Sequence, residues 1–287
     1  MAAVNKTLSI GYSPCPNDTF IFYALTHDKI RVPGLEFCER LEDVETLNRM
    51  ALEGALDITK ISYHAFGHVR EHYALLRSGG ALGMGCGPLI VARPGTTLDR
   101  LKQGTIAIPG KLTTAYLLLR LFDPAIRNVS IMPFDRIMAA VSQGEALAGL
   151  IIHESRFTYP TYKLEKLMDL GEWWERFSGL PIPLGGILGK RSLGSDVLAL
   201  AESAIRESLL YARSHTDEVM DYCKQHSQEM DERVMKSHIE LYVNDYSLDL
   251  GEEGLAAVRM LLNEAETRGI FPHDSRPLFV GEGNRRR

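Results

Sequence analysis

The chain has 287 residues, of which 45% are hydrophobic and 24% are charged, and its formal net charge is −5. This composition is typical of a globular protein of about two domains, and it excludes collagen-like and low-complexity chains. The acidic balance disfavours nucleic-acid binding, which requires a clustered positive field. A basic cluster, Arg285 to Arg287, lies at the C-terminus, and we interpret it as a frayed tail.

Hydropathy and cysteine spacing indicate the cellular setting. No apolar run approaches the roughly 20 residues that a membrane-spanning helix needs, so we predict no association with a membrane. Residues 1–8 lack the apolar core of a secretory signal, so we expect a cytoplasmic protein. No C-x-x-C pair is present, and in a reducing compartment we expect free thiols at Cys15, Cys38, Cys86 and Cys223.

The first part of the chain alternates short apolar strands with helices. Residues 7–13 (TLSIGYS) are typical of a buried strand. A turn-rich run follows, and we expect Asp18 or Thr19 to cap a helix that starts at Phe20. Further elements are predicted from apolar spacing: a helix ending at Leu52 before Gly54, and strands over 55–62 (ALDITKIS) and 89–92.

The middle of the chain repeats this order. Residues 105–109 (TIAIP) predict a strand, which a turn connects to an apolar helix over 115–122. Asp135 is expected to cap a second helix that Gly144 ends, and residues 146–155 (ALAGLIIHES) predict a strand with a polar end. The two copies of one order of elements indicate two similar α/β lobes.

The rest of the chain is mostly helical. After a return strand at 185–188, we predict helices over 197–213, capped by Ser195 or Asp196, and over 216–225, 231–242 and 251–268. The predicted fold is therefore α/β, with two lobes, a central ligand cleft and a helical C-terminal region. We expect lobe I to comprise residues 1–92 and 190–287, and lobe II residues 93–189. Ligands bind such sheets beyond the carboxyl ends of their strands, here between the lobes.

Two polar segments are candidates for binding an anion. Thr113 and Thr114 follow a strand and a glycine and begin an apolar helix, where free amides and the helix dipole favour a carboxylate or phosphate. The alternative is that one threonine only caps the helix. Lys60 and Ser62 point to one face at the end of a strand. The alternative there is a solvated lysine at a sheet edge.

His153 is our candidate for proton transfer. It follows an apolar run at the end of a predicted central strand, and a neutral imidazole accepts protons near neutral pH. The alternative is a histidine satisfied within a polar network. None of the other histidines has a comparable position in the sequence. His64, His68 and His72 are spaced for one helical face, but Ala65 stands where the helical zinc motif needs its glutamate, so we predict no metal site.

Four stretches together carry a resemblance to a known family. They are SPCPNDTFIFYAL at 13–25, LEDVETLNRMAL at 41–52, RSGGALGMG at 77–85 and GLIIHESRFTYP at 149–160. The chain resembles the 1,4-dihydroxy-6-naphthoate synthases of menaquinone biosynthesis from about residue 8 to residue 280. The resemblance implies a two-lobed fold like that of type II periplasmic binding proteins, with a hinge of two crossovers.

The resemblance also implies a reaction. Cyclic dehypoxanthine futalosine, a small-molecule carboxylate, would be converted into 1,4-dihydroxy-6-naphthoate with loss of a dihydroxyacetone-like fragment. The proton-accepting histidine of the family matches His153. The substrate-binding residues of the family match Lys60, Ile61, Ser62, Thr113 and Thr114. Aromatisation of the product implies that neither a redox cofactor nor a metal is required.

Three other functions fit the same architecture. A non-catalytic solute-binding protein would carry an export signal, and the effector domain of a transcription regulator would need a helix-turn-helix before the first strand; we find neither in the sequence. The sister chorismate dehydratase of the same pathway is disfavoured by the histidine of GLIIHES. Periodicity leaves the oligomeric state open.

Overall fold

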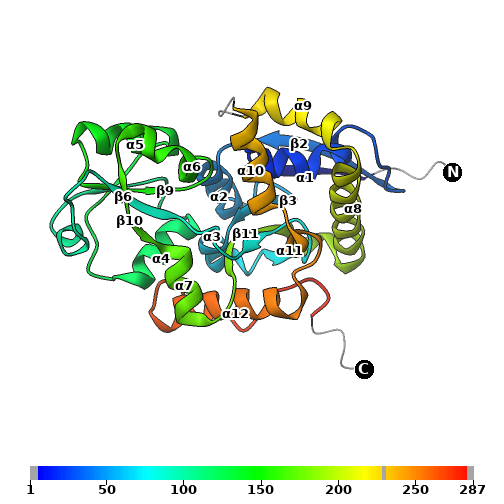
Figure 1. The fold of residues 1–287 in the computed structure, drawn as a ribbon. Coiled ribbons are helices and arrows are strands. Elements are labelled where there is room, and N and C mark those ends of the chain that lie inside the picture. The colour runs from blue at the N-terminus through cyan, green and yellow to red at the C-terminus, as the bar shows by residue number, and fades with distance from the viewer. Residues whose placement is uncertain (1–5, 228–230, 283–287) are drawn as a thin grey trace.

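The computed structural model describes residues 6–227 and 231–282. The predicted basic tail, Arg285 to Arg287, lies outside the described residues. The chain forms two β-sheets that lie side by side, each covered by helices (Figure 1). None of the helices in the described ranges is both long and apolar enough to cross a membrane.

The first sheet has the strand order β2-β1-β3-β11-β4, and β5 also pairs with β11. Its parallel part is β1 with β2 and β3, whereas β11 runs antiparallel to β3, β4 and β5. The strands are β1 (Lys6–Tyr12), β2 (Leu35–Leu41), β3 (Ile58–Ser62), β4 (Tyr73–Leu75), β5 (Ala81–Gly83) and β11 (Ile182–Lys190).

The second sheet has the order β10-β6-β9-β7-β8. Here β7 is parallel to β8 and β9, and β6 is antiparallel to β9 and β10. The strands are β6 (Leu89–Ala92), β7 (Ile106–Ile108), β8 (Val129–Ile131), β9 (Ala148–Ile151) and β10 (Glu165–Asp169). Each sheet thus combines a parallel core with an antiparallel strand.

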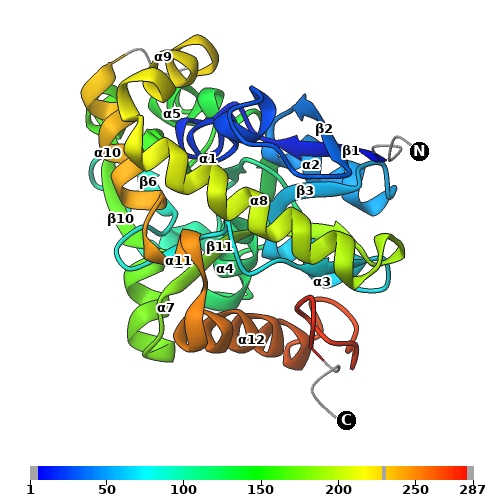
Figure 2. The ribbon, with the colours of Figure 1, turned by 90° about the vertical axis from the view of Figure 1, so that its right-hand side faces the viewer.

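Helices connect and cover both sheets. In Figure 2, α8 crosses in front of the first sheet with α1 behind it, and α12 runs below. The helices are α1 (Pro16–Thr26), α2 (Val44–Leu52), α3 (Tyr63–Val69), α4 (Thr114–Phe122), α5 (Phe134–Gln143), α6 (Ser155–Thr158), α7 (Leu170–Ser178), α8 (Ser195–Ser214), α9 (Thr216–His226), α10 (Glu232–Tyr242), α11 (Asp245–Leu248) and α12 (Gly251–Thr267). Short 3-10 turns cover 98–102, 159–162 and 191–193.

The two-lobed α/β prediction is confirmed, and strand pairing defines which strands belong together. β6 pairs within the second sheet although it precedes residue 93, and β11 pairs within the first sheet although it precedes residue 190. The predicted lobe limits, residues 1–92 with 190–287 and residues 93–189, remain a prediction. Judged by strand pairing alone, the chain would pass from one lobe to the other in the loop before β6, and back again in the stretch between β10 and β11.

Several predicted helix starts are wrong, and the first affects the site. Helix α1 begins at Pro16, with Cys15 as its N-cap, rather than at Phe20. Proline is favoured in the first turn of a helix because its missing N–H is not needed there. Pro133 rather than Asp135 occupies the N-cap of α5, and Gly194 that of α8. Gly144 does end α5, in the left-handed conformation with φ 86°.

The central strands are buried on both faces, as expected for a parallel core covered by helices. All five residues of β3 are buried, including the polar Thr59, Lys60 and Ser62. Burying a charged side chain in the middle of a sheet is unfavourable unless it is paired. The polar end of β3 therefore marks where the fold departs from a purely apolar core.

Candidate active site

A cavity of about 110 Å³ lies among α1, β3, α4, β11 and α10 and the segment that follows β9. Concave sites in which a few polar groups converge among apolar walls are where small ligands bind. All six site residues predicted from the sequence line it: Lys60, Ile61, Ser62, Thr113, Thr114 and His153. The fold therefore brings both predicted segments and the histidine to one place.

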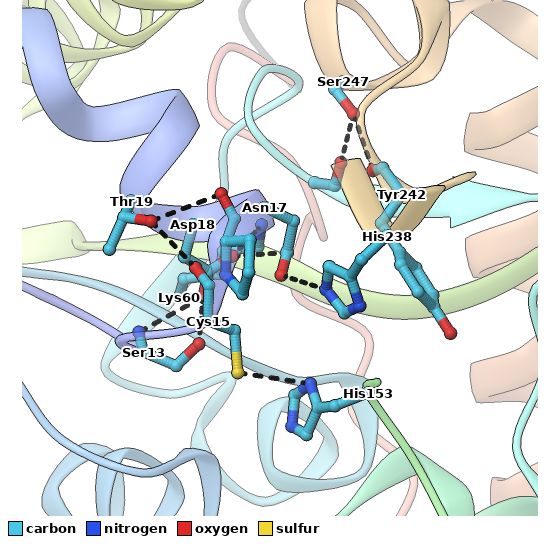
Figure 3. A network of polar contacts seen from close by, with 12 residues as sticks. Ser13, Cys15, Asn17, Asp18, Thr19, Lys60, His153, His238, Tyr242 and Ser247 are labelled. Carbon is cyan, nitrogen blue, oxygen red and sulfur yellow. Dashed lines mark hydrogen bonds and ion pairs between the residues drawn. The ribbon is translucent and has the colours of Figure 1, made fainter. Parts of the chain in front are cut away.

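Lys60 is paired inside the protein. Its Nζ lies 2.5 Å from Oδ1 of Asp18, and both side chains are buried. Nζ makes no well-aligned hydrogen bond, so the contact is chiefly a pairing of charges. Asp18 also accepts hydrogen bonds from the amide (3.1 Å) and hydroxyl (2.7 Å) of Ser13 (Figure 3). The alternative of a solvated lysine at a sheet edge is thus wrong, and the positive charge of Lys60 is compensated before any ligand binds.

The hydroxyl groups of the two threonines are engaged within the protein. Thr113 caps α4 by accepting from the Tyr116 amide (3.2 Å) and donates to the Gly110 carbonyl (2.9 Å). Thr114 donates to the Leu184 carbonyl (2.5 Å) and accepts from the Tyr63 amide (2.9 Å). Contact between these hydroxyls and a ligand would compete with those bonds. A helix leaves the backbone amides of its first turn without intrahelical partners, where an anion can bind, and in α4 the Tyr116 amide among them is taken by Thr113.

Ser62 is held by the buried Asn48 of α2. The Asn48 amide donates to the Ser62 hydroxyl (3.3 Å), and the Ser62 backbone N–H donates to Oδ1 of Asn48 (3.0 Å). Because the hydroxyl accepts in this pair, its own proton remains available. Ser62 therefore presents a hydrogen-bond donor at the cavity wall.

His153 lies two residues beyond the end of β9, so the predicted strand over 146–155 is too long. Its backbone adopts φ 56°, in the left-handed region that non-glycine residues rarely occupy. Such strained conformations cluster at functional sites. The ring packs edge-on against Phe134 with centroids 4.9 Å apart, and Nδ1 lies 3.4 Å from Sγ of Cys15.

The surroundings of His153 favour its neutral form. Burial lowers the imidazole pKa below its ordinary value, and the nearby Glu154 carboxylate opposes that shift. A neutral ring is the form that accepts a proton. If the Nδ1–H of His153 donates to the sulfur of Cys15, Nε2 is left as the accepting nitrogen.

Cys15 is a neutral thiol in this setting. Burial, together with the Glu154 and Asp18 carboxylates, raises its pKa well above the ordinary value. The thiolate is the nucleophilic and metal-binding form of cysteine. The ligand atoms of Cys15, His153 and Glu154 approach within 4.8 Å of one another, so the thiol, the imidazole and the carboxylate lie side by side. All four cysteines are free thiols, as predicted.

The three spaced histidines lie outside this cavity wall. Helix α3 ends at Val69, so His72 lies beyond it. His64 is buried, with Nδ1 3.3 Å from the Thr113 carbonyl, and its ring centroid is 5.6 Å from that of His68. Burial lowers the pKa of His64 to about 3. His64 is thus a buried neutral ring, whereas His68 on the same helix is exposed.

A stability prediction follows from the buried His64. Its pKa is lower in the folded chain than the value of about 6.5 in an unfolded one, so the unfolded state binds an extra proton between about pH 3 and 6.5. We expect His64 to lower the free energy of unfolding by about 1.4 kcal/mol for each pH unit below 6.5. Urea unfolding of the parent and of His64→Phe at several pH values measures the difference in slope. Equal slopes would contradict the prediction.

A second cavity histidine was missed by the sequence analysis. His238 of α10 is buried, lines the cavity, and has its ring centroid 6.3 Å from that of His153. It lies inside a helix rather than at the end of a strand, so the position that singled out His153 could not reveal it. The available signal was its position on the apolar stripe of a predicted helix, with Met235, Ile239 and Tyr242. Tyr242 lines the cavity as well.

Asn17 and Asp18 were also missed as cavity residues. Placing the helix start at Phe20 put Asp18 outside the helix as a cap. In the structure it lies in the first turn of α1, and its carboxylate turns to Ser13 and Lys60. The cluster of short polar side chains after β1 was the available signal.

Comparisons with known proteins identify the family. The family model described as menaquinone biosynthesis matches residues 8–267. A 1,4-dihydroxy-6-naphthoate synthase of Thermus thermophilus is 52% identical over 96% of this chain and 100% of its own length. The chain belongs to the family of 1,4-dihydroxy-6-naphthoate synthases. A relative of the same name from Streptomyces coelicolor is 46% identical over 93% of this chain and 95% of its own.

Solved structures agree with the fold. The crystal structure of protein AF1704 from Archaeoglobus fulgidus is 38% identical, with a TM-score of 0.87 over 92% of this chain and 98% of that one. The periplasmic aliphatic sulphonate binding protein SsuA of Escherichia coli has a TM-score of 0.65 at 12% identity, covering 93% and 89% of the two chains. This chain therefore has the periplasmic-binding-protein-like fold. Its family consists of enzymes of menaquinone biosynthesis.

Proposed function

We propose that this chain is a carbon–carbon lyase that converts cyclic dehypoxanthine futalosine into 1,4-dihydroxy-6-naphthoate, in the cytoplasm, on the futalosine route to menaquinone. The observation that carries the proposal is the meeting of His153 with the N-terminal end of α4 in one cavity, in a chain 52% identical to a named synthase. A proton acceptor and an anion-binding helix end are the two groups that this substrate requires.

The carboxylate of the substrate is proposed to bind at the first turn of α4, next to Thr113 and Thr114, with the Ser62 hydroxyl as a further donor. Lys60 is a weaker choice because its charge is already paired with Asp18. The groups proposed to bind the carboxylate are therefore the dipole of helix α4 and neighbouring hydroxyl groups, not an unpaired cation. A helix N-terminus of this kind favours a carboxylate. Ile61 contributes an apolar wall beside them.

His153 is proposed to accept a proton from the ribose-derived part of the substrate. The carbon–carbon bond to the dihydroxyacetone-like fragment then breaks, the ring system becomes aromatic, and the fragment takes back a proton from His153. Atoms and electrons of the substrate are divided between two products, so the step consumes no oxidant or reductant. Enclosure of the substrate in the cavity strengthens the polar contacts by excluding water.

The direct test is incubation of the purified protein with cyclic dehypoxanthine futalosine, with detection of the naphthoate by absorbance and of the released fragment by mass spectrometry. Chorismate is assayed in parallel. We expect turnover of the futalosine derivative only. A tight complex that forms no product would contradict the lyase proposal and favour a binding protein, and turnover of chorismate would favour the dehydratase.

A further inference from the structure

We propose that His238 recognises a hydroxyl group of the substrate: its Nδ1 accepts a hydrogen bond from a hydroxyl on the ribose-derived part, close to where His153 acts. This inference rests on the proposed function, because the hydroxyl that would donate to Nδ1 of His238 belongs to the substrate of that reaction. It adds a specificity-determining residue from the C-terminal helices to a site whose other predicted residues come from β3, α4 and the segment after β9.

The orientation of the His238 ring is fixed by a chain of hydrogen bonds (Figure 3). Asn17 donates from Nδ2 to Oδ1 of Asp18 at 2.7 Å. A carboxylate paired with Lys60 can only accept, so the amide oxygen of Asn17 must face His238. That oxygen lies 2.9 Å from Nε2.

This arrangement decides which nitrogen carries the proton. Nε2 must donate to the amide oxygen of Asn17, and a neutral imidazole then keeps its lone pair on Nδ1. Burial, with the positive charge of Lys60 and the neighbouring His153, lowers the pKa of His238 well below the ordinary value. The ring therefore stays neutral, and Nδ1 is a permanent acceptor.

No hydrogen-bond donor faces that acceptor among the described residues. Nδ1 of His238 is buried and unpartnered, although the side chain lines the cavity. Figure 3 shows this edge of the ring turned away from Asn17, toward the side where the rings of His153 and Tyr242 lie. Buried polar atoms are almost always paired, so an unpaired acceptor on a residue that lines a cavity points to a ligand that completes it.

The geometry makes the site selective. An acceptor that cannot become a donor favours an O–H group and repels a carbonyl oxygen, because two lone pairs would then face each other. Sites built to hydrogen-bond a hydroxyl discriminate strongly against analogues that lack it. His238 would thus distinguish the hydroxyl-bearing substrate from oxidised or deoxy compounds of the same shape.

A pair of variants separates the two nitrogens of the ring. His238→Gln keeps a polar group near the position of Nε2, facing Asn17, but removes the acceptor at Nδ1. His238→Asn keeps an acceptor near Nδ1 and gives up the contact with Asn17. We expect kcat/KM to fall about tenfold to a hundredfold in His238→Gln, mainly through KM, and by less in His238→Asn. His72→Gln, at an exposed histidine outside the cavity, is the matched control.

Substrate analogues that each lack one ribose-derived hydroxyl identify the donor. We expect one analogue to lose about as much kcat/KM with the parent protein as the full substrate loses with His238→Gln. That same analogue should lose little more when it is tested with the variant. Equal losses on the parent and the variant for every analogue would overturn the inference, as would an unchanged kcat/KM in His238→Gln.

A spectroscopic readout tests the ring itself without turnover. With ¹⁵N-labelled histidine, we expect Nε2 of His238 to be protonated and Nδ1 unprotonated in the free protein, and the Nδ1 signal to shift when substrate binds. The opposite tautomer would refute the inference. Failure of the parent protein to turn over the substrate would refute the proposed function instead, whereas normal turnover with an unaffected His238→Gln refutes only the role of His238.

Discussion

Replacing His153 by asparagine should lower kcat by a factor of about 10² to 10⁴ and leave the affinity for cyclic dehypoxanthine futalosine nearly unchanged. The expected loss reflects removal of the group that accepts the proton, while the walls that bind the substrate remain. Asparagine is the appropriate replacement because it tolerates the left-handed backbone, with φ 56°, that this position requires. Steady-state kinetics measure kcat, and calorimetric titration measures the dissociation constant.

A matched control makes the result specific. His72→Asn changes an exposed histidine that does not line the cavity, and it should turn over at the parental rate. A His153→Asn protein as fast as the parent would remove His153 from the mechanism.

Since burial lowers the pKa of His153, kcat/KM of the parent should be flat across neutral pH and fall only below about 6.5.

Replacing Lys60 by methionine should lower the free energy of unfolding by about 3 kcal/mol, because the buried Asp18 carboxylate loses the cation 2.5 Å away. The hydrogen bonds that Asp18 accepts from Ser13 remain, which places the loss at the lower end of the range for a broken buried pair. Chemical unfolding followed by circular dichroism gives the difference between parent and variant.

Two further variants separate charge from packing. In Lys60→Met combined with Asp18→Asn, no buried charge is left unpaired, so part of the lost stability should return. Lys102→Met breaks an ion pair with Asp123 whose lysine is half exposed, and it should change stability by less than about 1 kcal/mol. A Lys60→Met variant as stable as Lys102→Met would contradict a structural role for the buried pair.

Much of the fold follows from local sequence patterns. The helices α9, α10 and α12 lie within one residue of their predicted ranges, and α2 ends at the predicted Leu52, because apolar spacing and end signals agree. The strand over 89–92 was predicted with its actual bounds, whereas the return strand at 185–188 was predicted shorter than β11. Others were predicted too long, as at β9, where a polar residue after an apolar run continues the pattern although the backbone turns at His153. Apolar periodicity does not encode such a turn.

The site was only partly predictable for a different reason. Lys60 lies near the end of β3 in the first sheet, whereas Thr114 and His153 come after strands of the second sheet. Ligands bind such sheets beyond the carboxyl ends of their strands, and these strand ends line one cavity. His238 gives no such signal, because a histidine on the apolar stripe of a helix is compatible with burial in any core. Its proposed role depends on Asn17, more than 200 positions away in the chain, and no local pattern connects the two.

The wall formed by α10 has a consequence for how the protein matures. Cavity residues extend from Ser13 to Tyr242, so most of the polypeptide must leave the ribosome before the binding surface is enclosed. A growing chain that already contains His153 still lacks the face supplied by His238. The cavity is therefore complete only late in synthesis, after α10 has been made.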